Sequence, residues 1–236
     1  LFVRAANGFR APSVQGRILF SDDVTIADSE TINSIEAGIK SDVLDGSGRV
    51  NATVFYYQMS DQQLTAVGGD SGNTARLINA DKTVGYGFEV DTQWVLSDNF
   101  DATFNFSYNN TELQDDNLFL AGCFACTITD SKTDQDYSLD GNSLPHAPEW
   151  IANFILRYTR ELGDGEFYAY TDWSYRSEID FFLYDSVEFT GEALLEGGLR
   201  TGYKWYSGDT EYEIAAFARN ITDKQVFIGG VDFSNN

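Results

Sequence analysis

The sequence is poor in basic residues, in histidine and in long hydrophobic runs. Its 236 residues contain 15 Lys and Arg against 37 Asp and Glu, which gives a formal net charge of −22 at pH 7. A chain this negative repels the phosphates of nucleic acid, so nucleic-acid binding is excluded. The longest charge-free apolar stretch, residues 118–128, is far shorter than the ~18 residues that a membrane-spanning helix needs. A helical membrane protein is therefore excluded, whereas a transmembrane β-barrel is not.

Alternation of apolar and polar residues predicts nine β-strands and almost no helix. The expected strands are 1–9, 31–42, 49–60, 84–96, 99–110, 149–160, 166–177, 192–206 and 210–220. Short turns rich in Gly, Asp and Ser connect some of them, at 45–48, 97–98, 163–165 and 207–209. The other connections are long and polar and are expected to be irregular, at 10–30, 61–83, 111–148 and 178–191. Short and long connections alternate, which is typical of an antiparallel up-and-down barrel.

One face of the predicted sheet carries no charge in the five clearest strands. This face comprises alternate residues of the ranges 84–96, 100–108, 150–158, 167–175 and 193–205. All four tryptophans lie on it, and Trp94, Trp150 and Trp205 are within two residues of a strand end. A soluble β-sandwich also alternates, but it has no reason to place its amphipathic aromatics at the rims, whereas a barrel does so at both membrane interfaces. The sequence therefore predicts an all-β, transmembrane β-barrel.

The number of strands indicates that the barrel is incomplete. Single-chain bacterial barrels have an even number of strands, and nine is odd. We therefore expect at least one closing strand after Asn236. The chain begins at Leu1 without a signal-peptide pattern, so we interpret it as a fragment of a longer protein.

Four short motifs resemble, in their order, segments of the TonB-dependent outer-membrane receptors. Residues 8–13 read GFRAPS, as in that family, and residues 30–40 read ETINSIEAGIK, similar to its E-x-x-x-S-x-E-x-G-x-K strand. Residues 141–148 read GNSLPHAP, similar to G-N-x-L-P-N-A-P, and residues 219–224 read RNITDK, similar to x-N-L-T-D-K. The chain departs from the family where His146 stands in place of a common Asn, and it contains no plug domain or TonB box.

The resemblance implies that residues 1–236 are the C-terminal portion of such a receptor barrel, in the bacterial outer membrane. It implies active import of a scarce, bulky nutrient, commonly a ferric siderophore and sometimes cobalamin, a saccharide or another chelate. The implied partners are that substrate, the lipid of the outer membrane, and the inner-membrane TonB complex, which acts through a plug. No cofactor and no catalytic residue is implied.

Cys123 and Cys126 form the only C-x-x-C pair and lie in the longest predicted loop. A redox motif or a metal clip would need a thioredoxin-like context or a second pair of ligands, and the sequence has neither. We expect a small disulfide that pins the loop in an oxidising compartment.

Two further features of the loops are candidate sites with simple structural alternatives. The acid-rich stretch Asp130, Asp134, Asp136 and Asp140 offers oxygen ligands for Ca²⁺, but its spacing does not match an EF-hand, and a solvated loop is favoured. His146 is the only histidine, which excludes a two-histidine metal site and argues against a Ser-His-Asp hydrolase. No metal site is predicted.

Three polar or aromatic residues near the expected loop mouth are the candidates for substrate contact. Tyr57, Asn109 and Arg176 are predicted to face the lumen at that end of the barrel. The guanidinium of Arg176 suits a carboxylate or catecholate anion, although an ion pair within the lumen or a contact with the plug is at least as well supported.

The alternatives to a receptor belong to other classes. A passive outer-membrane porin or an adhesin would share the barrel but carry no plug. A secreted β-sheet binding module would dissolve without detergent. An outer-membrane hydrolase is disfavoured by the single histidine.

Overall fold

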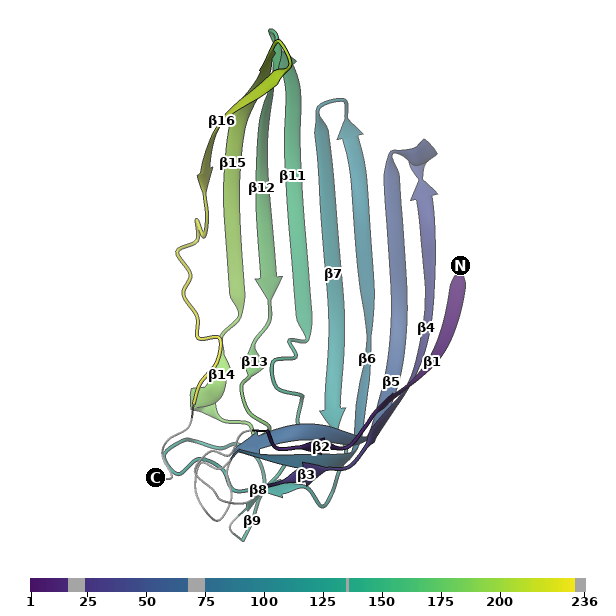
Figure 1. Cartoon of the computed structure of the whole chain (residues 1–236), viewed down its shortest axis with the longest axis vertical. Helices are drawn as coiled ribbons and strands as arrows, with labels where there is room; N and C mark the ends of the chain where they lie inside the picture. Colours follow the sequence, from purple (N-terminus) through teal and green to yellow (C-terminus); the bar gives the residue numbers. More distant parts are fainter. Residues whose placement is uncertain (17–23, 68–74, 135, 232–236) are drawn as a thin grey trace.

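A single sheet of nine antiparallel strands forms the body of the protein (Figure 1). The computed structural model describes residues 1–16, 24–67, 75–134 and 136–231. The long strands are β1 (Phe2–Arg10), β4 (Glu30–Val43), β5 (Gly48–Val67), β6 (Ala75–Ser97), β7 (Phe100–Leu113), β11 (Trp150–Leu162), β12 (Gly165–Arg176), β15 (Leu194–Ser207) and β16 (Thr210–Ala218). Their order in the sheet is their order in the chain. The predicted strands and the up-and-down topology are confirmed, and the described strands form an open wall because β1 and β16 are not paired with each other.

Short elements lie mainly in the long connections. In Figure 1 the hairpin turns are at the upper end of the sheet, and the short strands gather at the lower end. These strands are β2 (Ser13–Val14), β3 (Ile26–Ala27), β8 (Phe119–Leu120), β9 (Lys132–Thr133), β10 (Asp136–Ser138), β13 (Ile179–Asp180) and β14 (Thr190–Gly191). Two single 3₁₀ turns are η1 (Leu44–Gly46) and η2 (Val187–Phe189). Within the described ranges, no helix has the length and apolar character needed to cross a membrane.

The strand register keeps the predicted apolar positions on one continuous face. Phe104 of β7 lies opposite Thr92 of β6 on one side and Phe154 of β11 on the other. Phe154 in turn lies opposite Trp173 of β12. In the same way the ring of Trp150 packs on Tyr108, with centroids 4.5 Å apart. Because side chains alternate between the two faces of a strand, this register puts the charged residues on the opposite face.

Some charged residues of that opposite face form cross-strand ion pairs. Arg4 lies 3.7 Å from Glu36, and Arg200 lies 2.8 Å from Glu213. Each pair is partly exposed and contributes little to stability, but it balances charge on a wall that faces water. An apolar face and a polar, paired face are what a barrel wall between lipid and an aqueous lumen requires.

The expectation of an irregular loop at residues 61–83 is wrong for residues 61–67 and 75–83, and residues 68–74 lie outside the described residues. Strand β5 continues to Val67 and β6 begins at Ala75, so these two ranges are the paired outer part of a long β-hairpin. The ladder is interrupted at Asp61, whose backbone is left-handed with φ 55°. The Asn79 amide donates to the carbonyl of Asp61 at 2.7 Å and holds this bend. Figure 1 shows the hairpin turning across the lower end of the sheet.

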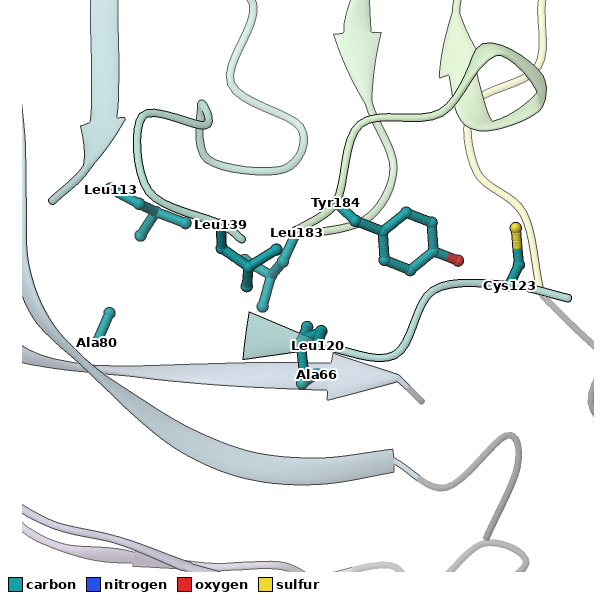
Figure 2. Packing of buried hydrophobic residues seen from close by; sticks show 8 residues of the cluster. All are labelled: Ala66, Ala80, Leu113, Leu120, Cys123, Leu139, Leu183 and Tyr184. Carbon is teal, nitrogen blue, oxygen red and sulfur yellow. The ribbon is translucent and has the colours of Figure 1, made fainter. Parts of the chain in front are cut away.

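The bent hairpin supports a compact assembly at the lower end of the sheet, which we call the loop cap. It comprises residues 61–67 and 75–81 of the hairpin and the connections 114–149 and 178–193. Figure 2 shows its apolar centre, which takes residues from the hairpin, from the end of β7 and from both connections. The buried cluster is Ala66, Ala80, Leu113, Leu120, Cys123, Leu139, Leu183 and Tyr184. The connections at 111–148 and 178–191, which were expected to be irregular, are therefore packed around a core that they share with the hairpin.

One side chain fastens the hairpin to the N-terminal segment. The side-chain amide of Gln63 donates to the carbonyls of Ala11 and Asp28, at 2.8 and 2.9 Å. Its backbone N–H donates to the carboxylate of Glu30 at 2.7 Å, and its side-chain oxygen accepts from the Ser13 hydroxyl. Gln63 is almost fully buried, and its hydrogen bonds to two segments, residues 11–13 and 28–30, make the bent position of the hairpin specific.

Candidate functional site

A hollow of about 640 Å³ lies between the loop cap and the end of the sheet. It opens beside the last residues of β7 and β12 and is closed by the connections 143–149 and 177–193. Its size is in the range of small-molecule sites, which are ~300–1,000 Å³. The residues that give it polar character are Asn109, Asn110, Thr111, Thr129, Ser143, Glu149, Ser177, Glu178, Asp180, Asp185, Ser186 and Thr190.

The lining of this hollow is acidic. Glu149, Glu178, Asp180 and Asp185 line it, and none of the described residues in the lining is Lys or Arg. Asp180 is fixed on both oxygens, since Ser143 Oγ donates to Oδ2 at 3.3 Å and Thr190 Oγ1 donates to Oδ1 at 3.0 Å. The hollow is therefore a negatively charged cavity with at least one rigid carboxylate.

Asp185 and its neighbour Asp130 form the most perturbed pair of carboxyl groups in the cap. Asp130 Oδ2 accepts the backbone N–H of Asp185 at 2.8 Å. Burial is the main cause that raises the pKa of Asp185 to about 6, and the charges of Asp130 and Asp180 raise it further. Burial also raises the pKa of Asp130. Desolvation and like charge both disfavour the ionised form, so Asp185 is ionised at neutral pH only at an energetic cost.

Backbone hydrogen bonds hold the segment that carries Asp185 against residues 127–129. Thr129 N–H donates to the carbonyl of Asp185 at 3.0 Å, and Val187 N–H donates to the carbonyl of Thr127 at 3.0 Å. The Glu188 carboxylate accepts from the N–H of Thr127 at 2.7 Å and from its hydroxyl at 3.0 Å. The first of these bonds is the main cause that lowers the pKa of Glu188. One wall of the hollow is thus a short, pinned pair of extended segments.

We expect Asp185→Asn to stabilise this wall at neutral pH and to flatten its pH dependence. A pKa raised from 3.8 to about 6 means that the folded wall binds the proton more tightly than the unfolded one. Its stability is then greatest in acid and falls as the pH rises from about 4 through 6. The side chain of Asn does not ionise, so the substitution removes this loss of stability. We expect the gain to be about 1 kcal/mol, because solvent screens part of the charge of a half-buried group. Hydrogen exchange of the Thr129 and Val187 amides from pH 4 to 7 measures the stability of the wall. The same pH dependence in the variant as in the unchanged protein would contradict the prediction.

The candidate residues Tyr57, Asn109 and Arg176 do not form one site. Asn109 lines the hollow, where its N–H donates to the carbonyl of Glu149 at 2.8 Å. Tyr57 lies elsewhere on the polar face, stacked on Phe55 with ring centroids 6.4 Å apart. Its ring also covers Gly85, where a Cβ atom would come within 2.1 Å of it.

Arg176 does not line the hollow that it was expected to serve. Its Nη1 donates to the carbonyls of Ser177 and Glu192, at 3.0 and 3.2 Å. Its guanidinium therefore acts on the backbone that follows β12. A role of Arg176 in binding an anion remains a prediction without support from this geometry.

The two cysteines lie together at the edge of the cap core. The structure places Cys123 and Cys126 as a bonded pair with Cα atoms 5.7 Å apart, a distance that a disulfide spans. Cys123 is buried against the core, and Cys126 packs on it. The geometry is that of a structural pin for the loop, as the sequence suggested, and this role stays a proposal.

The acid-rich stretch does not converge on one point. Asp130 faces Asp185, whereas Asp140 accepts the N–H of Asp115 at 2.9 Å in another part of the cap. In the ranges that the structure describes, no three Asp, Glu, Cys or His side chains are placed to hold a metal ion. His146 has a left-handed backbone, with φ 58°, and stacks on Phe181 with ring centroids 5.7 Å apart. His146 does not line the hollow.

Glu149, Glu178, Asp180 and Asp185 were not predicted as site residues. The latter three lie within the connection 178–191, which was expected to be irregular, and nothing in their spacing distinguishes them from other acidic residues of the loops. The only available signal was that this connection is acidic and directly follows a lumen-facing strand end.

Comparison with known proteins identifies the family. The family model described as TonB dependent receptor-like, beta-barrel matches residues 1–221. Among solved structures, the chain resembles the ferric yersiniabactin uptake receptor FyuA of Yersinia pestis, with 15% identity and a TM-score of 0.60 over 91% of this chain and 32% of that one. It also resembles BauA, the ferric preacinetobactin receptor of Acinetobacter baumannii, with 13% identity and a TM-score of 0.65 over 95% of this chain and 30% of that one.

A further similar structure is a G324V mutant of the ferric enterobactin receptor PfeA of Pseudomonas aeruginosa, with 17% identity and a TM-score of 0.56. The match covers 99% of this chain and 35% of that one, so the chain spans about a third of the length of these receptors. No curated protein sequence matches the chain. The solved structures agree with the barrel-wall fold, and the family model covers nearly the whole chain: the protein belongs to the TonB-dependent receptor-like β-barrel family.

Proposed function

We propose that the chain is the C-terminal part of the barrel of a receptor that imports a scarce, bulky nutrient across the bacterial outer membrane. The substrate class is a ferric siderophore or a similar metal chelate. The observation that carries this proposal is the loop cap, because it places a hollow of about 640 Å³ at the loop end of a barrel wall that belongs to this family. The chain acts as a transporter wall and capture surface, without catalysis.

The partners follow from the same assignment. The apolar face, with exposed side chains such as Phe104 and Leu199, meets the lipid of the outer membrane. The polar face lines the route of the substrate and contacts a plug that is supplied by another part of the receptor. Through that plug, the TonB complex of the inner membrane delivers the energy of the proton gradient.

The charge-free face and the family match favour this proposal over the alternatives. A secreted binding module would have to leave the continuous apolar face in water, which exceeds the patches that soluble monomers tolerate. A passive porin or an adhesin would share the apolar face, so energy dependence is the property that separates it from a receptor.

The experiment measures uptake of radioactive iron chelates by cells that produce the full-length receptor. Uptake is expected to stop when a protonophore collapses the proton gradient and when the TonB protein is deleted. A control porin in the same cells keeps passing a small sugar under both conditions. Uptake that continues without the gradient would assign the chain to a passive barrel.

A further inference from the structure

The lining of the hollow is negatively charged, which makes the hollow unsuited to an anionic chelate. Four carboxyl groups line it. The guanidinium of Arg176 is not part of the lining, and its Nη1 donates to the carbonyls of Ser177 and Glu192. An anion that entered would meet uncompensated negative charge in a partly desolvated cavity, where like-charge repulsion is strong. A cation that entered would be attracted by the same carboxyl groups.

Two buried polar atoms at the wall of the hollow lack partners. Ser186 is 3% exposed, and its Oγ makes no hydrogen bond within the described structure. The adjacent Asp185 Oδ1 is also buried and unpartnered there. Both residues line the hollow. Unsatisfied buried polar atoms are rare and costly. The ionised carboxylate of Asp185 can only accept a hydrogen bond, so its missing partner is a donor, whereas the Ser186 hydroxyl can either donate or accept.

We propose that this hollow binds the positively charged part of the transported substrate, an ammonium or similar organic cation on a metal chelate, and discriminates against anionic chelates. The inference deepens the proposed function and rests on it. An ammonium group offers three donors and no acceptor, which fits the hydroxyl of Ser186, the carboxylate of Asp185 and the fixed carboxylate of Asp180.

A bare metal ion is a poorer occupant than an organic cation. No group of three metal-ligating side chains is present among the described residues, and both oxygens of Asp180 already accept hydrogen bonds. The volume of about 640 Å³ also suits an organic group of the size of a chelate arm.

The titration of Asp185 gives the proposed site a pH dependence. The groups that face it are Asp130 from residues 127–131 and Asp180 from β13, and Glu149 and Glu178 complete the lining. With a pKa of about 6, Asp185 is protonated in acid and ionised at neutral pH. Binding of a cation is therefore expected to weaken below about pH 6, in the range in which the free wall becomes more stable.

The test uses the full-length receptor in detergent and one linear ferric trihydroxamate in three charge forms. The forms carry a free terminal amine, the same amine acetylated, and the same amine succinylated, so they are cationic, neutral and anionic. Affinities are measured by quenching of tryptophan fluorescence. We expect the cationic form to bind about tenfold more tightly than the neutral form and the anionic form to bind least tightly.

Variants locate the effect in the hollow. Asp185→Asn and the exposed Glu178→Gln are each expected to remove most of the preference for the cationic form over the neutral form. Asp116→Asn is the matched control, because it removes the same charge from an exposed position of the loop cap outside the lining. If Asp116→Asn had an equal effect, the preference for the cationic form would come from the overall negative charge of the loop cap and not from the hollow. That result would overturn the proposed cation site.

Other outcomes separate this inference from the function on which it rests. Equal or tighter binding of the anionic form, or no binding of any of the three forms, would overturn the cation site. Binding with the expected charge order but without energy-dependent uptake in cells would leave the cation site standing and remove the import function. Glu178→Gln keeps the test valid if Asp185→Asn alters the folding of the cap.

Discussion

Removal of residues 111–148, with Asn110 joined to Glu149 through an Asn-Gly turn, is expected to abolish substrate binding while the barrel still folds. The deletion takes away the largest connection of the loop cap and the Thr111, Thr129 and Ser143 wall of the hollow. We expect affinity to fall by at least about a hundredfold, which corresponds to ~2.8 kcal/mol. Binding of a ferric chelate to the purified receptor measures the loss.

The barrel should survive this deletion because the strands on either side remain paired. Tyr108 lies opposite Trp150, and Asn109 N–H donates to the carbonyl of Glu149, so a three-residue loop of Asn110 and the added Asn and Gly can join β7 and β11 directly. Heat-modifiable migration on gels should be retained. The rest of the cap should loosen, because Ala66, Ala80 and Leu183 lose the residues that cover them, and protease should cut there faster. Unchanged uptake by the deletion variant would contradict the role of the cap in capture.

Phe104→Arg is expected to destabilise the barrel by about 2–4 kcal/mol, the cost of a basic residue on the lipid face of a barrel near the bilayer midplane. Phe104 belongs to the charge-free face, with Thr92 and Phe154 as its cross-strand neighbours and the Phe106 ring 6.1 Å away. The substitution places a guanidinium among these side chains and in lipid. Urea unfolding of the full-length receptor in lipid vesicles measures the change in the free energy of unfolding.

The adjacent residue provides the control for this substitution. Asn105 lies on the opposite face, between Asp91 and Asn153, so Asn105→Arg puts the same charge beside a carboxylate and water. Its effect on stability should be within about 1 kcal/mol. Equal destabilisation by the two substitutions would show that the faces are not exposed to different media, and it would contradict the membrane-spanning wall.

The sequence determined the wall of the barrel because strand alternation is a local property. A period of two in residues such as those from Phe100 to Tyr108 assigns each side chain to a face, and turn residues such as Gly163 and Gly208, both with positive φ, mark where the chain reverses. Once one face must be free of charge, the register between neighbouring strands is almost fixed, since a slip by one residue would expose charge to lipid.

Tertiary structure alone decided the loop cap and its hollow. The outer part of the β5–β6 hairpin is stabilised by residues far away in the chain, through Leu113, Leu139 and Leu183 on one side and through the bonds of Gln63 on the other. These contacts leave no periodic signal in residues 61–83, and the interruption at Asp61 hides the strand further.

The same reason separates the predicted site residues from the observed ones. Asn109 could be placed near the mouth from strand alternation, but the directions of Arg176 and Asp185 depend on how the connection 178–193 folds back over the sheet. That path is set by long-range pairing, such as Ile128 with Ser186, and by packing around a shared core. Alternation therefore fixed which medium each face of the sheet meets, whereas the charge that faces the substrate was decided only when segments distant in the chain packed together.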